Sequence, residues 1–150
     1  MTKTIVKIIE VILIITALVS CTVDDTELGD TIDYNTIDLS VLSSNDWDFA
    51  EALTYHINNH RESVNLPALS LDMSYASALS ILHSNYMIDE NHISHAYSFN
   101  RIDFLKTNGA NQVAEIIGFN YITPQSFVNA WSMSQNHRNI IEGNYTHIGI

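Results

Sequence analysis

The sequence predicts an α+β domain in which helices are layered, αβα fashion, against a few short strands. Three observations predict this class. Apolar residues recur at helical spacing through much of 46–131, short apolar segments rich in β-branched residues come only late in the chain, and segments of the two kinds follow one another. The length of 150 residues suits one domain. A hydrophobic content of 46% is too high for a chain that remains disordered.

The chain begins with the layout of an export signal. Two lysines precede an apolar run over 11–19, and the small Ser20 comes directly before Cys21. The run is too short to span a bilayer. Residues 18–21 resemble the bacterial lipobox, in which the cysteine becomes the lipidated first residue of the mature protein. We therefore expect a signal peptide over 1–20 and a membrane anchor on Cys21. The alternative is an ordinary signal peptide with an incidental cysteine.

An acidic, polar segment over 21–45 follows the signal. Thr, Ser, Asp and Asn dominate it, no helical period persists, and it contains no Lys or Arg. We expect a solvated tether between the lipid and a folded domain at 46–150, because such a composition buries little apolar surface. The formal net charge of −11 opposes a nucleic-acid partner, since phosphate recognition depends on Lys and Arg. A single cysteine excludes an internal disulfide framework and a zinc site made of several thiolates.

Two helices are expected in the first half of the domain. Asp46 or Asn45 can cap the first one, and Pro67 ends it because the residue before a proline avoids the helical region. Asp72 can cap the second helix, which carries a wide apolar stripe over 75–87.

The second half of the domain predicts four shorter elements: a helix over 98–106, a buried strand over 113–117, a helix from Pro124 through Trp131, and the start of a strand over 146–150. Asn108 and Gly109 end the first of these helices. The β-branched side chains of 113–117 favour a strand. Thr123 directly before the proline is typical of a helix cap followed by proline at the first helical position.

Three histidines lie on the two long predicted helices. His56 and His60 are four residues apart and share a face, so they could chelate a metal. No Glu lies between them in the arrangement of a metalloprotease helix, and we expect a solvent-facing pair. His83 lies on the second helix, where we expect a half-buried, hydrogen-bonded side chain.

Four other side chains with chemical capacity lie in loops or near element ends, where functional groups tend to be presented: His95, Glu115, His137 and His147. Two or three imidazoles with a carboxylate can bind a divalent ion, or divide acid and base roles between them. Their spacing in the sequence does not by itself bring them together. No nucleophile elbow, phosphate loop or dinucleotide fingerprint is present in the sequence.

A series of short motifs in fixed order resembles a known family. The motifs are Ile57-Asn58-x-x-Arg61, Leu66-Pro67-x-Leu69, Ala78, His83, Met87, Ser94-His95, Arg101, Gly109, Val113-Ala114-Glu115, Trp131-x-x-Ser134-x-x-His137-Arg138 and Asn144-Tyr145-Thr146-His147-Ile148-Gly149. Together they resemble the CAP domain of cysteine-rich secretory proteins, antigen 5 and pathogenesis-related proteins, in its bacterial, cysteine-poor branch. The resemblance covers about 47–150.

The resemblance implies a fold and a site. CAP domains are αβα sandwiches with a wide central cleft, and they continue with further strands beyond the position of Ile150, so a C-terminally short CAP domain is expected. By position, His95, Glu115 and His137 match cleft residues that in the family can hold a divalent metal, often zinc. His147, in the late strand entry, is counted with these three as a ligand-binding residue of the cleft. Ile116 replaces the asparagine that usually follows the cleft glutamate.

The resemblance and the export signal together predict a non-catalytic binding module. It is exported and attached to a membrane through Cys21, and its cleft takes a small or apolar ligand or an extracellular partner. One alternative is a metal-assisted hydrolase of peptides or envelope material, with Glu115 as general base and His95 and His137 as metal ligands. The other is an inert, truncated copy.

Overall fold

The computed structural model describes residues 33–34 and 36–150. The expected signal peptide at 1–20, the expected lipidation site Cys21 and the first part of the expected tether at 21–45 lie outside the described residues. Within the described part of the chain, no helix is long and apolar enough to span a bilayer.

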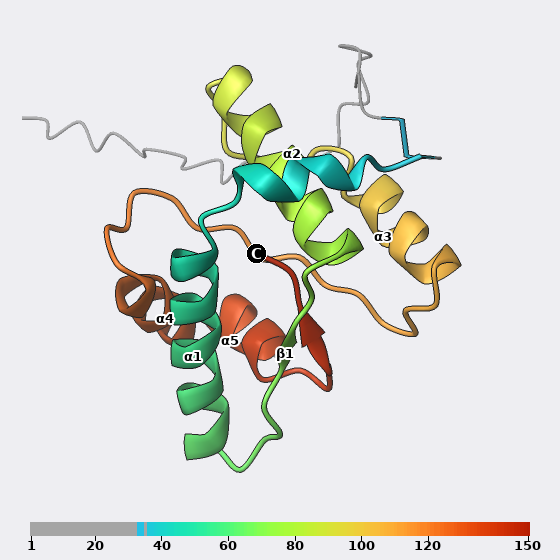
Figure 1. The fold of residues 1–150 in the computed structure, drawn as a ribbon. Coiled ribbons are helices and arrows are strands. Elements are labelled where there is room, and N and C mark those ends of the chain that lie inside the picture. Colours follow the sequence, from blue (N-terminus) through green and yellow to red (C-terminus); the bar gives the residue numbers. More distant parts are fainter. Residues whose placement is uncertain (1–32, 35) are drawn as a thin grey trace, which may run out of the picture.

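The described chain consists of helices and two very short strands, which confirms the predicted α+β class. Its elements are, in order, η1 (Leu39–Ser44, a 3-10 helix), α1 (Trp47–Ser63), β1 (Ser70–Leu71), α2 (Tyr75–Asp89), α3 (Ser98–Thr107), α4 (Pro124–Met133), α5 (Gln135–Ile141) and β2 (His147–Ile148). Strands β1 and β2 pair in parallel, with Ser70 opposite His147 and Leu71 opposite Ile148. Figure 1 shows α1, α4 and α5 gathered on one side of these strands and α2 and α3 on the other.

The four predicted helices are present, and local capping accounts for where they begin. The carboxylate of Asp46 accepts from the Phe49 backbone N–H at 3.0 Å at the start of α1. Thr123 and Ser126 form a reciprocal capping box at the start of α4. Helix α2 begins at Tyr75, later than its predicted cap suggested. Asp72 still serves this end, because its carboxylate accepts from the Ala76 N–H at 2.7 Å.

The strand predicted at 113–117 is wrong. The structure has no regular element there, although the late strand predicted at 146–150 is present as β2. A β-branched pattern makes a strand only where another strand supplies hydrogen bonds. Here Ile116 packs against the core, and the Ile117 carbonyl accepts from Trp131 Nε1 at 3.1 Å.

The end of the segment expected to be a solvated tether lies against the domain. Helix η1 contacts α2, and Trp47 Nε1 donates to the Leu42 carbonyl at 3.2 Å. The Asp38 carboxylate caps η1 by accepting from the Ser40 N–H at 2.8 Å. None of the residues of η1 is buried, so this contact is superficial.

The core lies between α1, α4 and α5. Its buried members are Leu53, Ile57, Leu69, Val128, Trp131 and Ile141. Arg61 is also buried, at 1% exposure, on the last turn of α1. Its Nε donates to the Pro67 carbonyl at 2.8 Å, and its Nη1 donates to the carbonyls of Ile141 and Gly143 at 2.8 and 2.9 Å. This guanidinium therefore ties α1 to the end of α5, beside the strand β2.

Candidate functional site

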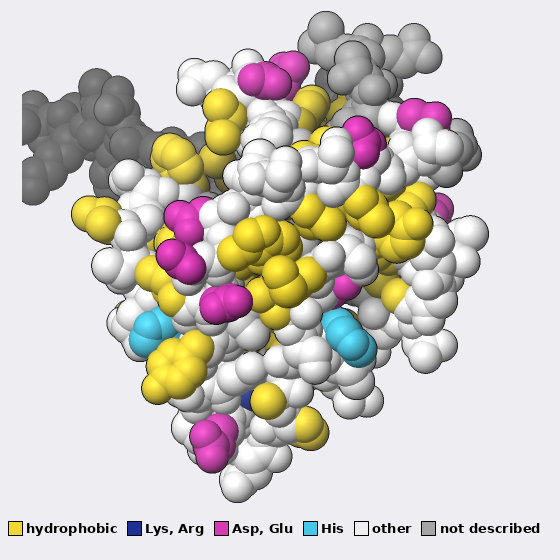
Figure 2. Space-filling model, viewed as in Figure 1, with side chains coloured by type: hydrophobic (Ala, Val, Ile, Leu, Met, Phe, Trp, Pro, Cys, Tyr) yellow, Lys and Arg dark blue, Asp and Glu magenta, His cyan; other side chains and the backbone are white. Residues whose placement is uncertain are grey.

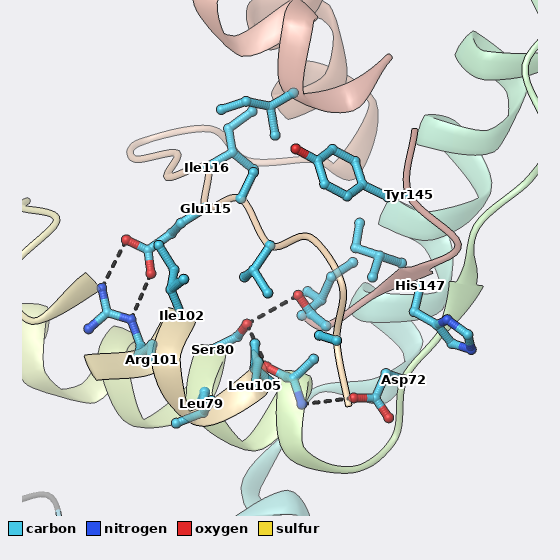
Figure 3. Close-up of a pocket in the computed structure, with 18 of the residues that line it drawn as sticks. Asp72, Leu79, Ser80, Arg101, Ile102, Leu105, Glu115, Ile116, Tyr145 and His147 are labelled. Atoms are coloured by element: carbon cyan, nitrogen blue, oxygen red, sulfur yellow. Dashed lines mark hydrogen bonds and ion pairs between the residues drawn. The ribbon is translucent and has the colours of Figure 1, made fainter. Parts of the chain in front are cut away.

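A cavity of about 960 Å³ lies next to this core. Its walls come from all five helices α1 to α5, the irregular segment 108–118 and the segment 144–150. Apolar side chains form more of the wall than polar ones, and Leu79, Ile102 and Leu105 point into it (Figure 3). A large concave site with an apolar wall and a few polar groups is typical of a ligand pocket.

Arg101 and Glu115 face one another at one end of this cavity (Figure 3). Nε and Nη2 of Arg101 donate to the two carboxylate oxygens of Glu115 at 2.7 and 2.9 Å, which makes a bidentate ion pair. His95 Nδ1 donates to Oε1 of the same carboxylate at 2.7 Å. The Arg101 side chain is 5% exposed, that of Glu115 22% and that of His95 57%. The cluster thus runs from a buried cation to an exposed imidazole.

The backbone before α3 brings this cluster together. Tyr97 has φ 57°, in the left-handed region, which costs a non-glycine residue of order 1 kcal/mol. This turn joins the loop that carries His95 to the helix that carries Arg101. The Tyr97 ring packs edge-on against Tyr86 with ring centroids 5.6 Å apart, and Arg101 Nη1 donates to the Ala96 carbonyl at 2.7 Å. These contacts hold the strained turn in place.

The neighbours of Glu115 keep it ionised. Burial acts to raise the pKa of Glu115, but the hydrogen bonds from Arg101 and His95 outweigh burial, and the net pKa lies below its ordinary value. The carboxylate is therefore a weak proton acceptor at neutral pH.

His83 supports the loop that carries His95. Its side chain is buried at 4% exposure, and its Nε2 donates to the Ser94 carbonyl at 2.8 Å. The predicted hydrogen bond is confirmed, and burial is more complete than predicted. Burial, followed by the nearby Arg101 charge, lowers the pKa of His83, so the imidazole is neutral at neutral pH.

The structure brings together two of the four predicted site residues, His95 and Glu115. His137 is half-buried on α5, and no hydrogen bond or ion pair joins it to either of them in the described part of the chain. His147 belongs to the wall of the cavity, but its ring is exposed and points away from the space (Figure 3). Its Nδ1 lies 2.8 Å from Thr146 Oγ1.

The arrangement does not fit the metal that the resemblance implies. Among residues 33–34 and 36–150, no three or more His, Cys, Asp or Glu side chains are grouped to hold an ion. Both oxygens of Glu115 already accept from the Arg101 guanidinium, whose positive charge repels a cation at the same carboxylate. The chemistry of this end of the cavity is that of a fixed ion pair.

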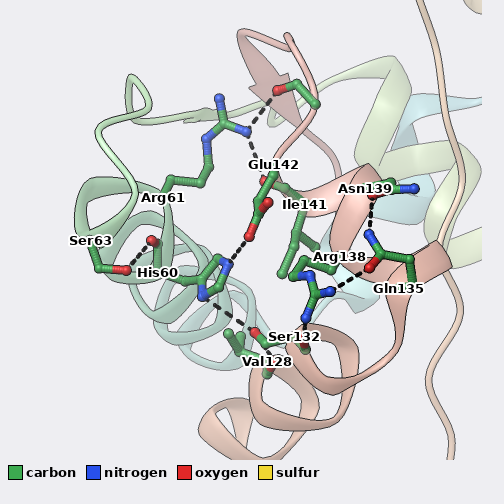
Figure 4. A network of polar contacts seen from close by, with 11 residues as sticks. His60, Arg61, Ser63, Val128, Ser132, Gln135, Arg138, Asn139, Ile141 and Glu142 are labelled. Atoms are coloured by element: carbon green, nitrogen blue, oxygen red, sulfur yellow. Dashed lines mark hydrogen bonds and ion pairs between the residues drawn. The ribbon is translucent and has the colours of Figure 1, made fainter.

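The expectation that His60 faces solvent is wrong. His60 Nε2 donates to the Glu142 carboxylate at 2.8 Å, and its Nδ1 lies 3.4 Å from Ser132 Oγ (Figure 4). Its side chain is 19% exposed. The partner Glu142 is 82 positions further along the chain, so helical spacing alone could not reveal it.

Arg101 is the site residue that reasoning from local pattern missed. Its position in the motif series was noted, but its bond to Glu115 was not. A lone arginine on a short polar helix, followed by a glutamate in an apolar segment, was the signal that could have suggested a buried ion pair.

The fold and this site define an α+β domain with a packed helical core and an adjoining apolar cavity. The sequence model of the cysteine-rich secretory protein family, CAP, matches residues 54–150. The chain belongs to this family, and its two-stranded sheet is consistent with a CAP fold without the later strands. No curated protein and no solved structure matches the chain.

Proposed function

We propose that this CAP domain is a non-catalytic binding module whose cavity holds a small apolar molecule or an apolar segment of a partner. The observation that carries the proposal is the cavity of about 960 Å³, which is lined on one side by the core residues Leu53, Ile57, Trp131 and Ile141. Burial of apolar surface stabilises a complex by about 25 cal/mol per Å², so even a partly filled cavity gives useful affinity.

The ion pair supports a binding role over a hydrolytic one. A general base needs a free lone pair close to the proton that it abstracts. Both oxygens of Glu115 are engaged by Arg101, and its pKa is lowered. The pair instead gives the cavity one polar end, which can orient a ligand that carries a hydrogen-bonding group.

A fluorescent fatty acid, dansylamino-undecanoate, tests the proposal in the full chain. Trp131 lines the cavity, so energy transfer from tryptophan to the bound dansyl group reports occupancy. Ile102→Asn places an amide in the wall and is expected to weaken binding about tenfold, because the buried amide lacks a partner. Phe99→Asn is the matched control on the same helix, since Phe99 is 70% exposed. Absence of saturable energy transfer, or equal effects of the two variants, would overturn the proposal.

We also propose that the protein is exported and anchored to a bacterial membrane through a lipid on Cys21. The apolar run, the small residue and the single cysteine support this. In a bacterial expression host, Cys21→Ala is expected to move the protein out of the membrane fraction or to leave it unprocessed, because the acyl chains supply most of the membrane affinity. A variant that is processed and still membrane-bound contradicts the anchor.

A further inference from the structure

A second, smaller cavity of about 530 Å³ lies between α1 and α4. It shares no lining residue with the apolar cavity, and its lining is of a different kind. Val128 and Met133 are the only residues of this lining whose side chains carry neither nitrogen nor oxygen. The other lining side chains include His56, His60 and Ser132. A space lined by nitrogen and oxygen atoms suits a small polar ligand or an ion.

His60 presents a free lone pair to this space. Its Nε2 lies 2.8 Å from the Glu142 carboxylate, which can only accept, so Nε2 carries the ring proton (Figure 4). In a neutral imidazole the other nitrogen, Nδ1, then has a lone pair and no proton. A carboxylate behind the ring is also the usual support of a metal-binding histidine, because it fixes the ring and makes the opposite nitrogen more basic.

Ser132 does not occupy this lone pair. Its Oγ lies 3.4 Å from His60 Nδ1, but it donates to the Val128 carbonyl at 2.7 Å. A hydroxyl has one proton, and the shorter contact takes it. Two atoms with lone pairs therefore face each other across 3.4 Å. Two ligand atoms that each lie about 2.1 Å from a tetrahedral zinc ion are about 3.4 Å apart, so this spacing is that of one edge of a zinc tetrahedron.

His56 can supply a second imidazole. It lies one helical turn before His60 on the same face of α1, and it lines the same cavity. Its ring packs edge-on against Tyr55, with ring centroids 5.3 Å apart. No hydrogen bond or ion pair engages this ring in the part of the chain that the structure describes, so its nitrogens are available to a ligand.

The charge around the smaller cavity is compatible with a cation. No Lys or Arg is among its lining residues. Arg138 donates to the Ser132 carbonyl, but its side chain does not line the space. The whole chain has 17 acidic and 6 basic residues, and Figure 2 shows Asp and Glu with very little Lys or Arg on the face in view. This field attracts cations, whereas the carboxylate of Glu115 is already bonded to Arg101.

We propose that α1 and α4 hold a zinc ion between them, with His56 and Nδ1 of His60 as nitrogen ligands, Ser132 Oγ as an oxygen ligand and water in the fourth position. Neutral imidazoles are ligands that zinc favours. The ion joins α1 to α4 and, through Glu142, to the end of α5. With two histidines and a hydroxyl, the site is smaller than the groups of three or more His, Cys, Asp or Glu that the described residues lack. It is independent of the ligand proposed for the apolar cavity.

The first test is calorimetric titration of zinc chloride into the untagged full chain. We expect one zinc ion per chain. His56→Ala and His60→Gln are each expected to weaken zinc binding at least about tenfold, because each removes a ligand. His60→Gln keeps a donor for Glu142, and thermal denaturation verifies that both variants fold. His92→Ala is the matched control, since it removes an exposed histidine from a loop and is expected to bind zinc as the wild type does.

Glu142→Gln tests the positioning role of the carboxylate. The amide oxygen can still accept from His60 Nε2, but the negative charge is lost, and zinc binding is expected to weaken about tenfold. Glu62→Gln removes an exposed carboxylate near the end of α1 and is expected to leave zinc binding unchanged. Equal effects of the two variants would show that general charge, and not the bond to His60, supports the ion.

NMR of the ring nitrogens gives a readout that needs no variant. In the zinc-free wild type at about pH 8, above the ordinary pKa of histidine, we expect a proton on His60 Nε2 and none on Nδ1. Zinc is then expected to shift the ring signals of His56 and His60. A proton on His60 Nδ1 overturns the proposal. So does zinc that shifts only the His95 ring, or a loss of binding in His92→Ala as large as in His56→Ala.

Discussion

The two sides of the sheet differ in how completely they bury their apolar residues. On the side of α1, α4 and α5, residues such as Leu53 and Ile57 are at most 4% exposed, and the helices close upon one another. On the side of α2 and α3, Leu79 is buried as well, but Ile88 and Phe99 are more than two-thirds exposed, and α3 contributes no buried apolar residue. The cavity lies between the two sides, because Leu53 and Ile57 line it together with Ile102 and Leu105. The difference lies in how many neighbouring helices each side has to pack against, and not in how apolar its residues are. Binding capacity arises where packing is left incomplete.

The two buried arginines also differ between the two sides of the sheet, in the groups to which they donate hydrogen bonds. Arg61 is held by backbone carbonyls within the closed half, so it acts as part of the core. Arg101 is held by the carboxylate of Glu115 at the wall of the cavity, where it acts as part of the site. Variants at these two arginines test the comparison most strongly.

Arg61→Ala is expected to have the largest effect, about 3 kcal/mol of unfolding free energy, because buried carbonyls lose charged donors. Urea denaturation measures it. Arg138→Ala, on the same side of the molecule but half-buried and bonded to Ser132 and Gln135, is the control and should cost below about 1 kcal/mol. Equal losses would show that Arg61 is not special to the closed half.

Arg101→Leu is expected to cost about 2 kcal/mol, because a partly buried Glu115 then lacks its cation. The double variant Arg101→Leu, Glu115→Leu should cost less than the sum of the single losses. The folded pKa of Glu115 is lowered, so its stabilisation is present above the ordinary value of 4.5 and is lost as the pH falls below it. Additive losses, or a wild-type pH profile in Glu115→Leu below pH 4.5, would contradict this role.

Ile116→Asn is expected to cost about 1 kcal/mol, although it restores the usual residue of the family at this position. Ile116 packs against the core, and an amide there loses apolar contact. Thermal denaturation measures the loss, with the exposed Ile122→Asn as control. A gain in stability would show that an asparagine finds hydrogen bonds in this wall.

His83→Gln is expected to flatten the pH dependence of stability between neutral pH and pH 5. The folded pKa of His83 is lowered, so the wild type is most stable above the ordinary value of 6.5 and loses stability as the pH falls below it. Glutamine can still donate to the Ser94 carbonyl but does not titrate. The measurement is urea denaturation at several pH values, and an unchanged slope in the variant would assign this dependence to other groups.

Deletion of 22–37 is expected to have the smallest effect, below about 0.5 kcal/mol, because that segment has few apolar groups to bury. Deletion of 22–44 also removes η1 and should cost about 1 kcal/mol through lost contact with α2. Equal melting temperatures for the two deletions would show that residues 39–44 do not stabilise the domain and behave as part of the tether.

The sequence was most informative where structure is decided locally. Asp46 and the Thr123 and Ser126 box mark the starts of α1 and α4 because a cap acts within a few residues. The strand at 113–117 was wrong because a strand needs a partner that local pattern does not reveal. Helix α5 was missed because its seven residues carry no apolar period.

The candidate site could be predicted only from the resemblance to CAP domains, and only in part. His95 and Glu115 were paired by position in the family, and the structure joins them at 2.7 Å. The grouping of His137 with them is not found among the described contacts, since α5, which carries His137, packs on α4. His60 shows the same limit, because a long-range partner changed an apparently exposed residue into a bonded one.

The parallel pairing of β1 with β2 has a consequence for the order of folding. It joins the middle of the chain to its last residues, and Asn45 also donates to the Ile150 carbonyl, 105 positions away. Tyr145, Ile148 and Ile150 pack against the core. The helices that are synthesised earlier therefore complete their packing only after these residues have left the ribosome. A nascent chain without these residues lacks the packing that they give to the core, so the domain closes only late in its synthesis.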